Sequence, residues 1–389
     1  MNSYAAKPLT SGKPIRVQLI DDSAVVRGLT RRWLSGNSDI EIVAVSVDGA
    51  QGVADAGQHS PDVIILDVEM PRMSGLEALP HLRRVAPKAK ILMASTLTHK
   101  GATTTIKALS LGASDYLPKP EAGQLGGAEA YRDALLEKIR VFGSPERARS
   151  PALPAKPLQP FAPRPATPNG APAVAGRDRA SQTAHVPGLR PLPMVHKRPD
   201  ALLIGSSTGG PQALQEMLPA LCKLTNLPIL IVQHMPATFT QILAEHLNQV
   251  CAHTVHEGKD GQLVEPNNVY IAPGGYHMTV TRQGGRPTLK TNQDPPVNFC
   301  RPSADVLFES AAATYGGSLA AIVLTGMGSD GCKGVAPILE KGGRTFIQDQ
   351  ESSVVWGMPG SLYNAGFAHS QHSLKELAPA IDKYLRGGR

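Results

Sequence analysis

The sequence predicts two α/β domains joined by a long linker, and three observations support this. Up to residue 142, five short apolar runs alternate with amphipathic stretches. A stretch rich in Pro, Ala and Arg, without helical or strand periodicity, fills 143–199. A second alternation of strand and helix patterns covers 200–386. Because this alternation is typical of parallel sheets covered by helices on both faces, we expect one such domain at 14–142 and a second, doubly wound and mostly parallel, at 200–386.

The strands of the first region are short runs rich in aliphatic residues. Helical patterns such as 23–34 and 101–111 separate them. The five expected strands are IRVQLI, EIVAVS, DVIIL, KILMAS and DYL.

Carboxylates follow the first and the third of these strands. Asp21 and Asp22 come after IRVQLI, Asp67 comes after DVIIL, and Lys119 lies in LPKP beyond the last strand. Because parallel strand ends converge on one edge of a sheet, we expect these groups to meet there. Three adjacent carboxylates repel one another unless a cation joins them, and Mg²⁺ suits oxygen ligands and a phosphate. Each Asp taken singly could instead cap a helix or close a turn.

A carboxylate can also carry a phosphoryl group as an aspartyl phosphate, so Asp67 is the candidate carrier. At these positions the first region resembles the receiver domain of bacterial response regulators. The resemblance implies a flavodoxin-like (βα)5 fold, phosphorylation of Asp67 by a histidine kinase, and Mg²⁺ as the metal. The implied metal ligands are Asp21, Asp22, Asp67 and the backbone carbonyl of Glu69, and the implied switch residues are Ser95, Tyr116 and Lys119.

Composition excludes several classes of protein. No apolar run is long enough to span a bilayer, and the first ten residues lack the apolar core of a signal peptide, so we expect a cytoplasmic location. The four cysteines are far apart and form no C-x-x-C pair, which favours free thiols over a zinc site or disulfides.

The formal net charge of +7 lies entirely in the linker. Between residues 144 and 199 there are nine Lys or Arg against Glu146 and Asp178, a surplus of seven that equals the whole excess. The flanking regions are therefore neutral together, which argues against nucleic acid as a partner. We expect a disordered, semi-rigid linker whose charge keeps it solvated, and contact with membranes only through a partner.

In the second region the strand ALLIG turns through SSTGGPQ into a helix. Such a turn directs backbone N–H groups at an anion or a developing oxyanion. Dinucleotide loops need G-x-G-x-x-G and a later acidic residue, whereas here the next strand ends in His234. Asp330 follows the strand LAAIVLTG. A serine nucleophile needs a general base, and the base needs an acidic partner, so we expect a serine, His234 and Asp330 to meet at one sheet edge.

The strings IGSSTGG, VQHMP and LTGMGSDG resemble the catalytic domain of the chemotaxis protein-glutamate methylesterases, the CheB family. YIAPGGYHM, PPVN, RPSADVLF and VVWGMPG extend the resemblance over nearly all of 200–386. The resemblance selects Ser207 as the nucleophile, His234 as the base and Asp330 as its orienter, although Ser206 stands where many members have alanine. The backbone amides expected to hold an oxyanion are those of Thr208, Gly209, Gly210 and Met327.

The resemblance implies hydrolysis of methyl esters on glutamates of methyl-accepting chemotaxis receptors, deamidation of receptor glutamines, no metal for the esterase, and a chemotaxis histidine kinase as phosphodonor. The family's unphosphorylated receiver covers the esterase cleft, so a chain beginning near Asp200 is expected to be constitutively active. Three alternatives stay open: a DNA-binding output domain, a nucleotide-dependent oxidoreductase, and a response regulator whose output domain is catalytically idle and only binds receptors.

Overall fold

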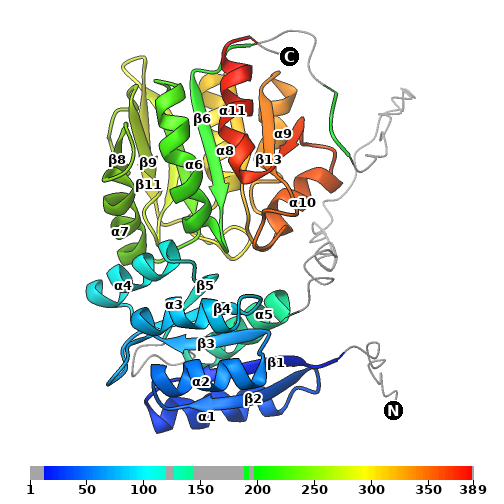
Figure 1. Cartoon of the computed structure of the whole chain (residues 1–389). Coiled ribbons are helices and arrows are strands. Elements are labelled where there is room, and N and C mark those ends of the chain that lie inside the picture. Colours follow the sequence, from blue (N-terminus) through cyan, green and yellow to red (C-terminus); the bar gives the residue numbers. More distant parts are fainter. Residues whose placement is uncertain (1–12, 120–126, 144–187, 192–196, 388–389) are drawn as a thin grey trace, which may run out of the picture.

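A computed structural model describes residues 13–119, 127–143, 188–191 and 197–387. Two α/β units lie one above the other, with the smaller N-terminal unit below the carboxyl-terminal one (Figure 1). Each contains a parallel sheet with helices on both faces, so the predicted fold class is confirmed.

The N-terminal unit is a five-stranded parallel sheet in the order β2-β1-β3-β4-β5. The chain alternates strictly between strands and helices, as predicted. Its elements are β1 (Ile15–Ile20), α1 (Ala24–Ser35), β2 (Ile40–Ser46), α2 (Gly49–His59), β3 (Val63–Asp67), α3 (Gly75–Val85), β4 (Lys90–Ser95), α4 (His99–Ser110), β5 (Asp115–Pro118) and α5 (Gly127–Gly143).

Both faces of this sheet are buried. On one face Leu79 and Ile106, from α3 and α4, pack on the strands, and on the other face Leu34 and Leu135 do so from α1 and α5. Parallel strands that are covered on both faces are buried along their whole length and are therefore mostly apolar. VIILD is buried at all five positions, and only its last residue, Asp67, is charged.

The larger unit has seven parallel strands in the order β14-β13-β12-β6-β7-β9-β8, and the antiparallel pair β10-β11 lies beside them. Its elements are β6 (Ala201–Ser206), α6 (Gly210–Leu224), β7 (Ile229–Gln233), α7 (Ala237–Asn248), β8 (Thr254–Glu257), β9 (Asn268–Ile271), β10 (His277–Gln283), β11 (Arg286–Asn292), α8 (Ala304–Tyr315), β12 (Leu319–Val323), α9 (Val335–Glu340), β13 (Arg344–Gln348), α10 (Gly357–Asn364), β14 (Ser370–His372) and α11 (Leu374–Leu385).

The strand order reverses at β6. The chain proceeds from β6 to β7 on one side and later returns to place β12 on the other side of β6. Helices α6, α7 and α11 contribute to the core on one face of the sheet, and α8, α9 and α10 to the core on the other. In open α/β sheets the crevice at such a switch point, outside the carboxyl ends of the strands, is where ligands bind.

The two units are in contact along the carboxyl edge of the larger sheet. Helix α4 packs against α6 and α7 (Figure 1). The rings of Tyr116 in β5 and Phe239 in α7 stack with their centroids 4.6 Å apart and an angle of 15° between their planes. Val355 of the larger unit is buried in the apolar cluster that contains Leu135 of α5. The direct contacts between the two units are therefore largely apolar.

The part of the expected linker that the structure describes departs from the expectation of a disordered segment. Leu189 forms a parallel bridge with Ala368, and the Tyr384 hydroxyl donates to the carbonyl of Lys197 at 2.8 Å. Backbone hydrogen bonds and a buried tyrosine thus hold these residues on the larger unit. Most of the predicted linker, 144–187 and 192–196, lies outside the described residues.

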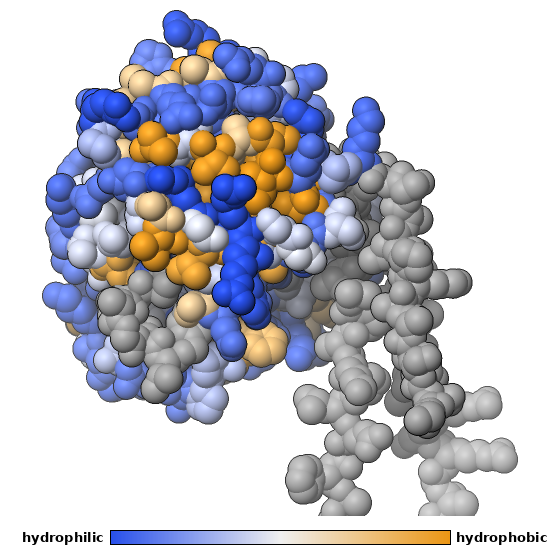
Figure 2. Space-filling model, turned by 90° about the horizontal axis from the view of Figure 1, so that it is seen from below, coloured by the Kyte–Doolittle hydropathy of each residue, from blue (hydrophilic) through white to orange (hydrophobic). Residues whose placement is uncertain are grey.

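Within the described ranges no helix is long and apolar enough to cross a bilayer. The space-filling view from below shows apolar side chains gathered among polar ones at the end formed by the N-terminal unit (Figure 2). The large apolar side chains of this unit that remain exposed are Val25, Leu29, Val47, Val85 and Leu111.

Candidate active site

The turn between β6 and α6 carries Ser207. Gly209 has φ +76°, and a side chain at this position would also meet Val354. A Cβ on Gly210 would meet the carboxamide oxygen of Gln233. Both glycines are therefore needed for the sharp turn that places Ser207 at the start of α6. No side chain caps this helix, and within the described residues no hydrogen bond uses the amides of Thr208 and Gly209 in the turn before it.

The structure separates the two adjacent serines. Ser206 is fully buried, and its hydroxyl donates to Gln233 Oε1 at 2.7 Å. Ser207 instead lines an open cavity, and its hydroxyl has no hydrogen-bond partner among the described residues. Of the two, only Ser207 is accessible to a substrate.

His234, which follows β7, contacts Asp330, which follows β12. His234 Nε2 lies 2.8 Å from Asp330 Oδ2. The carboxylate is buried and also accepts hydrogen bonds from the Ser303 hydroxyl at 2.7 Å and the Ala304 amide at 2.6 Å. Asn298 Nδ2 adds a further contact at 3.2 Å. Asp330 is therefore a fixed acceptor that orients the imidazole.

These contacts determine the charge state of the pair. Burial would raise the pKa of Asp330, but the hydrogen bonds from His234 and its other donors hold that pKa below its usual value. Burial would lower the pKa of His234, but the hydrogen bonds with Asp330 and Cys300 outweigh it and raise the pKa to about 9. In the resting site His234 therefore carries two protons at neutral pH.

Ser207 and His234 line the same cavity but are not hydrogen-bonded to each other. The second ring nitrogen of His234, Nδ1, lies 3.5 Å from the sulfur of Cys300. Because Nε2 is bonded to Asp330, Nδ1 is the nitrogen that can accept the serine proton. The Ser207 hydroxyl must come within hydrogen-bond distance of that nitrogen before it can transfer its proton.

The backbone amides expected to hold an oxyanion differ in whether they already donate a hydrogen bond. The Gly210 amide donates to the carbonyl of Ser207 at 2.8 Å, so it would have to leave this partner before it could donate to an oxyanion. No hydrogen bond within the described chain uses the amides of Thr208, Gly209 or Met327. Thr208 and Met327 both line the cavity.

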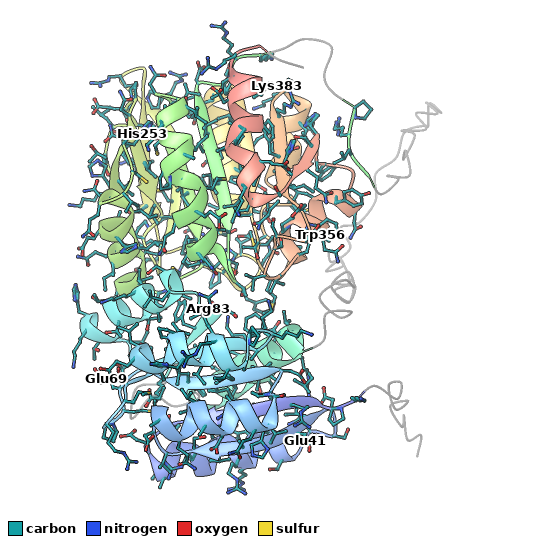
Figure 3. The ribbon with its side chains drawn as sticks, in the orientation of Figure 1. Glu41, Glu69, Arg83, His253, Trp356 and Lys383 are labelled. Carbon is teal, nitrogen blue, oxygen red and sulfur yellow. The ribbon has the colours of Figure 1, made fainter. Side chains whose placement is uncertain are left out.

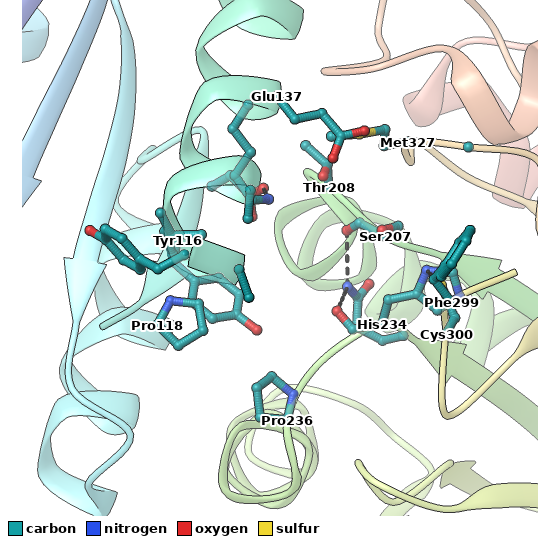
Figure 4. A pocket seen from close by; sticks show the side chains of 18 of the residues that line it. Tyr116, Pro118, Glu137, Ser207, Thr208, His234, Pro236, Phe299, Cys300 and Met327 are labelled. Atoms are coloured by element: carbon teal, nitrogen blue, oxygen red, sulfur yellow. Dashed lines mark hydrogen bonds and ion pairs between the residues drawn. The ribbon is translucent and has the colours of Figure 1, made fainter. Parts of the chain in front are cut away.

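The cavity has a volume of about 950 Å³ and lies between the two units. On one side are Ser207, His234 and Met327, and facing them from the N-terminal unit are Tyr116 and Glu137 (Figure 4). The N-terminal unit therefore forms one wall of the candidate active site.

Two family models match the chain: the response regulator receiver domain over residues 17–126 and the CheB methylesterase over residues 202–381. A protein-glutamate methylesterase/protein-glutamine glutaminase of Azospirillum brasilense is 46% identical over 96% of this chain and 93% of the relative. The chain belongs to the CheB family.

A second CheB relative, from Maricaulis maris, has the same printed name and is 44% identical over the whole of both chains. The crystal structure of the Thermotoga maritima CheB methylesterase catalytic domain is 37% identical, covers 48% of this chain and 98% of that chain, and has a TM-score of 0.46. The resemblance predicted from the motifs is confirmed by the family models and by the two full-length relatives.

The receiver domain of this CheB-family chain gathers its predicted acidic residues. Carboxylate oxygens of Asp21, Asp22 and Asp67 lie within 4.8 Å of one another. Lys119 Nζ bridges Asp21 and Asp67 at 2.9 Å from each. Burial is the largest influence on Asp67 and, although Lys119 opposes it, raises the pKa to about 6. An oxygen-only set of this kind fits Mg²⁺, with the backbone carbonyl of Glu69 left as a proposed ligand.

The other receiver residues have distinct surroundings. The Glu69 side chain lies at the outer edge of the domain, where it is exposed and pairs with Lys100 at 3.1 Å (Figure 3). Ser95 is buried at the end of β4, and its hydroxyl donates to the Thr96 carbonyl at 3.2 Å. Tyr116, the predicted aromatic switch, is buried at the interface with the esterase domain.

Motif reasoning missed residues that support the site. Gln233 donates to the carbonyl of Ser207 at 2.9 Å and accepts from Ser206, so it fixes the turn that carries the nucleophile. A glutamine at the end of the apolar strand ILIVQ, directly before His234, was the available signal, because a buried amide needs partners. Nothing in the sequence pointed to Phe239 as the receiver's contact or to Cys300 beside the base.

Proposed function

We propose that this chain hydrolyses methyl esters on glutamate side chains of methyl-accepting chemotaxis receptors, releasing methanol, and deamidates receptor glutamines. The observation that carries the proposal is the imidazole of His234, fixed by the buried Asp330 in the same cavity as Ser207. The printed names of the full-length relatives support the substrate class.

The first half of the reaction forms an acyl-enzyme. The Ser207 hydroxyl attacks the ester carbonyl while neutral His234 accepts its proton at Nδ1. His234 then gives that proton to the departing methoxide, and methanol leaves. Asp330 keeps the ring oriented and stabilises the imidazolium. No metal is needed for these steps.

The tetrahedral intermediate needs donors for its negative oxygen. The amides of Thr208, Gly209 and Met327 are uncommitted, and the first two lie at the positive end of the uncapped α6. Removal of one such donor typically costs about a hundredfold or more in rate. Water attacks the acyl-enzyme in the second half, with His234 again as the base and the glutamate carboxylate as the product.

Deamidation follows the same route with ammonia as the leaving group. Because an amide has a poorer leaving group than an ester, protonation by His234 is more important for glutamine than for the methyl ester. The same three residues therefore account for both activities.

The receiver regulates access to this site. The receiver forms one wall of the cavity of about 950 Å³. Because an α-helix with its side chains is about 10–12 Å wide, a receptor helix cannot enter the cavity while the receiver is docked on it. Separation of Tyr116 from Phe239 opens the cavity.

Asp67 is the proposed phosphorylation site and a chemotaxis histidine kinase the phosphodonor. Asp21, Asp22, Asp67 and the Glu69 carbonyl would hold Mg²⁺, which when bound supplies charge neutralisation for the phosphoryl group. Lys119 already contacts Asp67, Ser95 ends the neighbouring strand β4, and Tyr116 lies in β5 beyond it. A phosphoryl group adds about two negative charges, which favours a different receiver conformation and weakens its contact with α7. A cytoplasmic location stays a prediction.

Methanol release from receptor membranes tests the proposal. The full chain is incubated with membranes containing methylated chemotaxis receptors, with and without a small-molecule phosphodonor and Mg²⁺. We expect release in both conditions and more with the phosphodonor. Asp67→Asn retains the basal release but loses the stimulation. Receptor binding without any methanol would instead support the idle output domain.

A further inference from the structure

Cys300 lies at the one edge of the catalytic imidazole that the proposed reaction needs. Its sulfur is 3.5 Å from His234 Nδ1 and 3.4 Å from the carbonyl of Asn298. His234 Nε2 is already bonded to Asp330 at 2.8 Å. The sulfur therefore contacts the nitrogen that must accept the Ser207 proton in the proposed reaction.

A strained turn holds Cys300 there. Asn298 and Phe299 have φ values of +52° and +62°, and the amides and carbonyls of Val297 and Cys300 bond reciprocally at 3.1 and 2.8 Å. Two central residues with positive φ make this a type I′ turn, in which a phenylalanine is costly. Asn298 Nδ2 also donates to Asp305 Oδ2 at 2.9 Å, which fixes the turn to α8. Strain of this kind persists only where the surroundings enforce it.

The hydrogen bonds around Cys300 are complete only when His234 is protonated at both nitrogens. In that state Nε2–H donates to Asp330, Nδ1–H donates to the sulfur, and S–H donates to the carbonyl of Asn298. In a neutral imidazole bonded to Asp330 through Nε2–H, Nδ1 carries no proton. The thiol could then donate to Nδ1 only by giving up its hydrogen bond to the Asn298 carbonyl. The arrangement favours the conjugate acid, which cannot take a proton from Ser207.

We propose that Cys300 is a positioning residue that holds the Nδ1 edge of His234 in the resting enzyme and competes there with the Ser207 hydroxyl. This inference rests on the proposed esterase function and deepens it. Two features then limit activity in the resting enzyme. The receiver closes the cavity, and the Cys300 thiol occupies Nδ1 of His234.

Other ionisable groups contact His234, lie beside its partner Asp330 or line the same cavity, and none of them is substituted in the test. Asp330 and its neighbour Asp305 lie on the esterase side. The groups that line the cavity from the receiver side are Asp115, Tyr116, Lys119, Tyr131, Glu137 and Lys138. Substitution of Cys300 alone removes one influence and leaves these in place.

The pH dependence of methanol release tests the proposal in the full chain. For the parent, the rise of kcat/KM with pH reports deprotonation of His234 in the free enzyme. Cys300→Ala is expected to move the midpoint of this rise to lower pH, and kcat/KM at pH 7 to increase about tenfold for each unit of that shift. Cys300→Ser keeps a hydrogen-bonding group and is expected to give an intermediate midpoint. Cys251→Ala, far from the site in the fold, is the control.

A second readout does not depend on turnover. The imidazole C–H signal of His234, assigned with His234→Gln, is followed by NMR from pH 5 to 10, and its midpoint should fall in Cys300→Ala as the kinetic midpoint does. An unchanged or raised midpoint by both methods overturns the role of Cys300. Absence of methanol from the parent itself overturns the esterase proposal instead, so the two failures are distinguishable.

Discussion

At the scale of single residues, Asp67 shows how a functional charge lowers stability. Burial raises its pKa from 3.8 to about 6. Between these two pH values the folded chain keeps a proton on Asp67 that the unfolded chain has released. Stability contributed by this group is present below the unfolded pKa of 3.8 and is lost as pH rises through about 6. We expect Asp67→Asn to stabilise the chain at pH 7 by about 1–3 kcal/mol in Mg²⁺-free buffer.

Thermal unfolding of the parent and Asp67→Asn at several pH values measures this effect. The gain should shrink as pH falls and vanish near pH 4, and Asp22→Asn, whose side chain is exposed, should change stability by less than about 0.5 kcal/mol. An equal gain at pH 4 and pH 7 would show that the buried charge is not its cause.

Ser206 is the matched comparison for the nucleophile. Its buried hydroxyl bonds to Gln233, so Ser206→Ala leaves an amide oxygen without that donor and should destabilise the chain by about 1–3 kcal/mol. Urea unfolding measures the loss, with Ser110→Ala on the exposed surface of α4 as the control. Normal stability together with lost turnover would mean that the two serines have been interchanged.

At the scale of elements, the stack between β5 and α7 connects the receiver to the esterase. Phe239→Leu retains an apolar side chain but removes the ring contact with Tyr116, which is worth about 0.5–1.5 kcal/mol. Methanol release by the unphosphorylated chain should rise about two- to tenfold, while release in the presence of phosphodonor stays unchanged. Phe346→Leu, buried elsewhere in the same domain, should leave both rates unaltered. An unchanged basal rate in Phe239→Leu would remove the stack from the inhibitory contact.

Sequence periodicity predicted most elements because the strands of both domains are buried on both faces and are therefore continuously apolar. The runs for β1, β3, β4 and β6 illustrate this. The hairpin β10-β11, HMTVTRQ and RPTLKTN, was not assigned, because its partly exposed residues mix polar and apolar types. The type I′ turn at Asn298 was also missed, since Asn-Phe lacks the glycine that normally marks such a turn.

Site residues were predictable where chemistry demands a residue type at a strand end, as for Asp67, His234 and Asp330. Supporting residues were not, because Gln233, Asn298 and Phe239 act through contacts between segments far apart in the chain. Motif spacing cannot reveal that the Gly210 amide is already bonded to Ser207. Such facts depend on tertiary geometry alone.

At the scale of the whole molecule, the receiver and the esterase share one cavity. A chain that lacks the receiver should release methanol without phosphodonor at least as fast as the stimulated full chain. It should begin at Gly188 and not near Asp200, because Leu189 and Lys197 contact the esterase domain. Rates are compared at equal folded concentration, judged by circular dichroism. Equal rates for the truncated and the unphosphorylated full chain would remove the covering role of the receiver.

The proposed reaction depends on Ser207, and not its neighbour Ser206, attacking the ester. Methanol release from methylated receptor membranes is therefore compared for the parent, Ser207→Ala and Ser206→Ala, each in the presence of phosphodonor and Mg²⁺. We expect Ser207→Ala to lose at least about a thousandfold in rate while still binding receptors, and folded Ser206→Ala to stay within about tenfold of the parent. Retained turnover in Ser207→Ala would show that another group is the nucleophile.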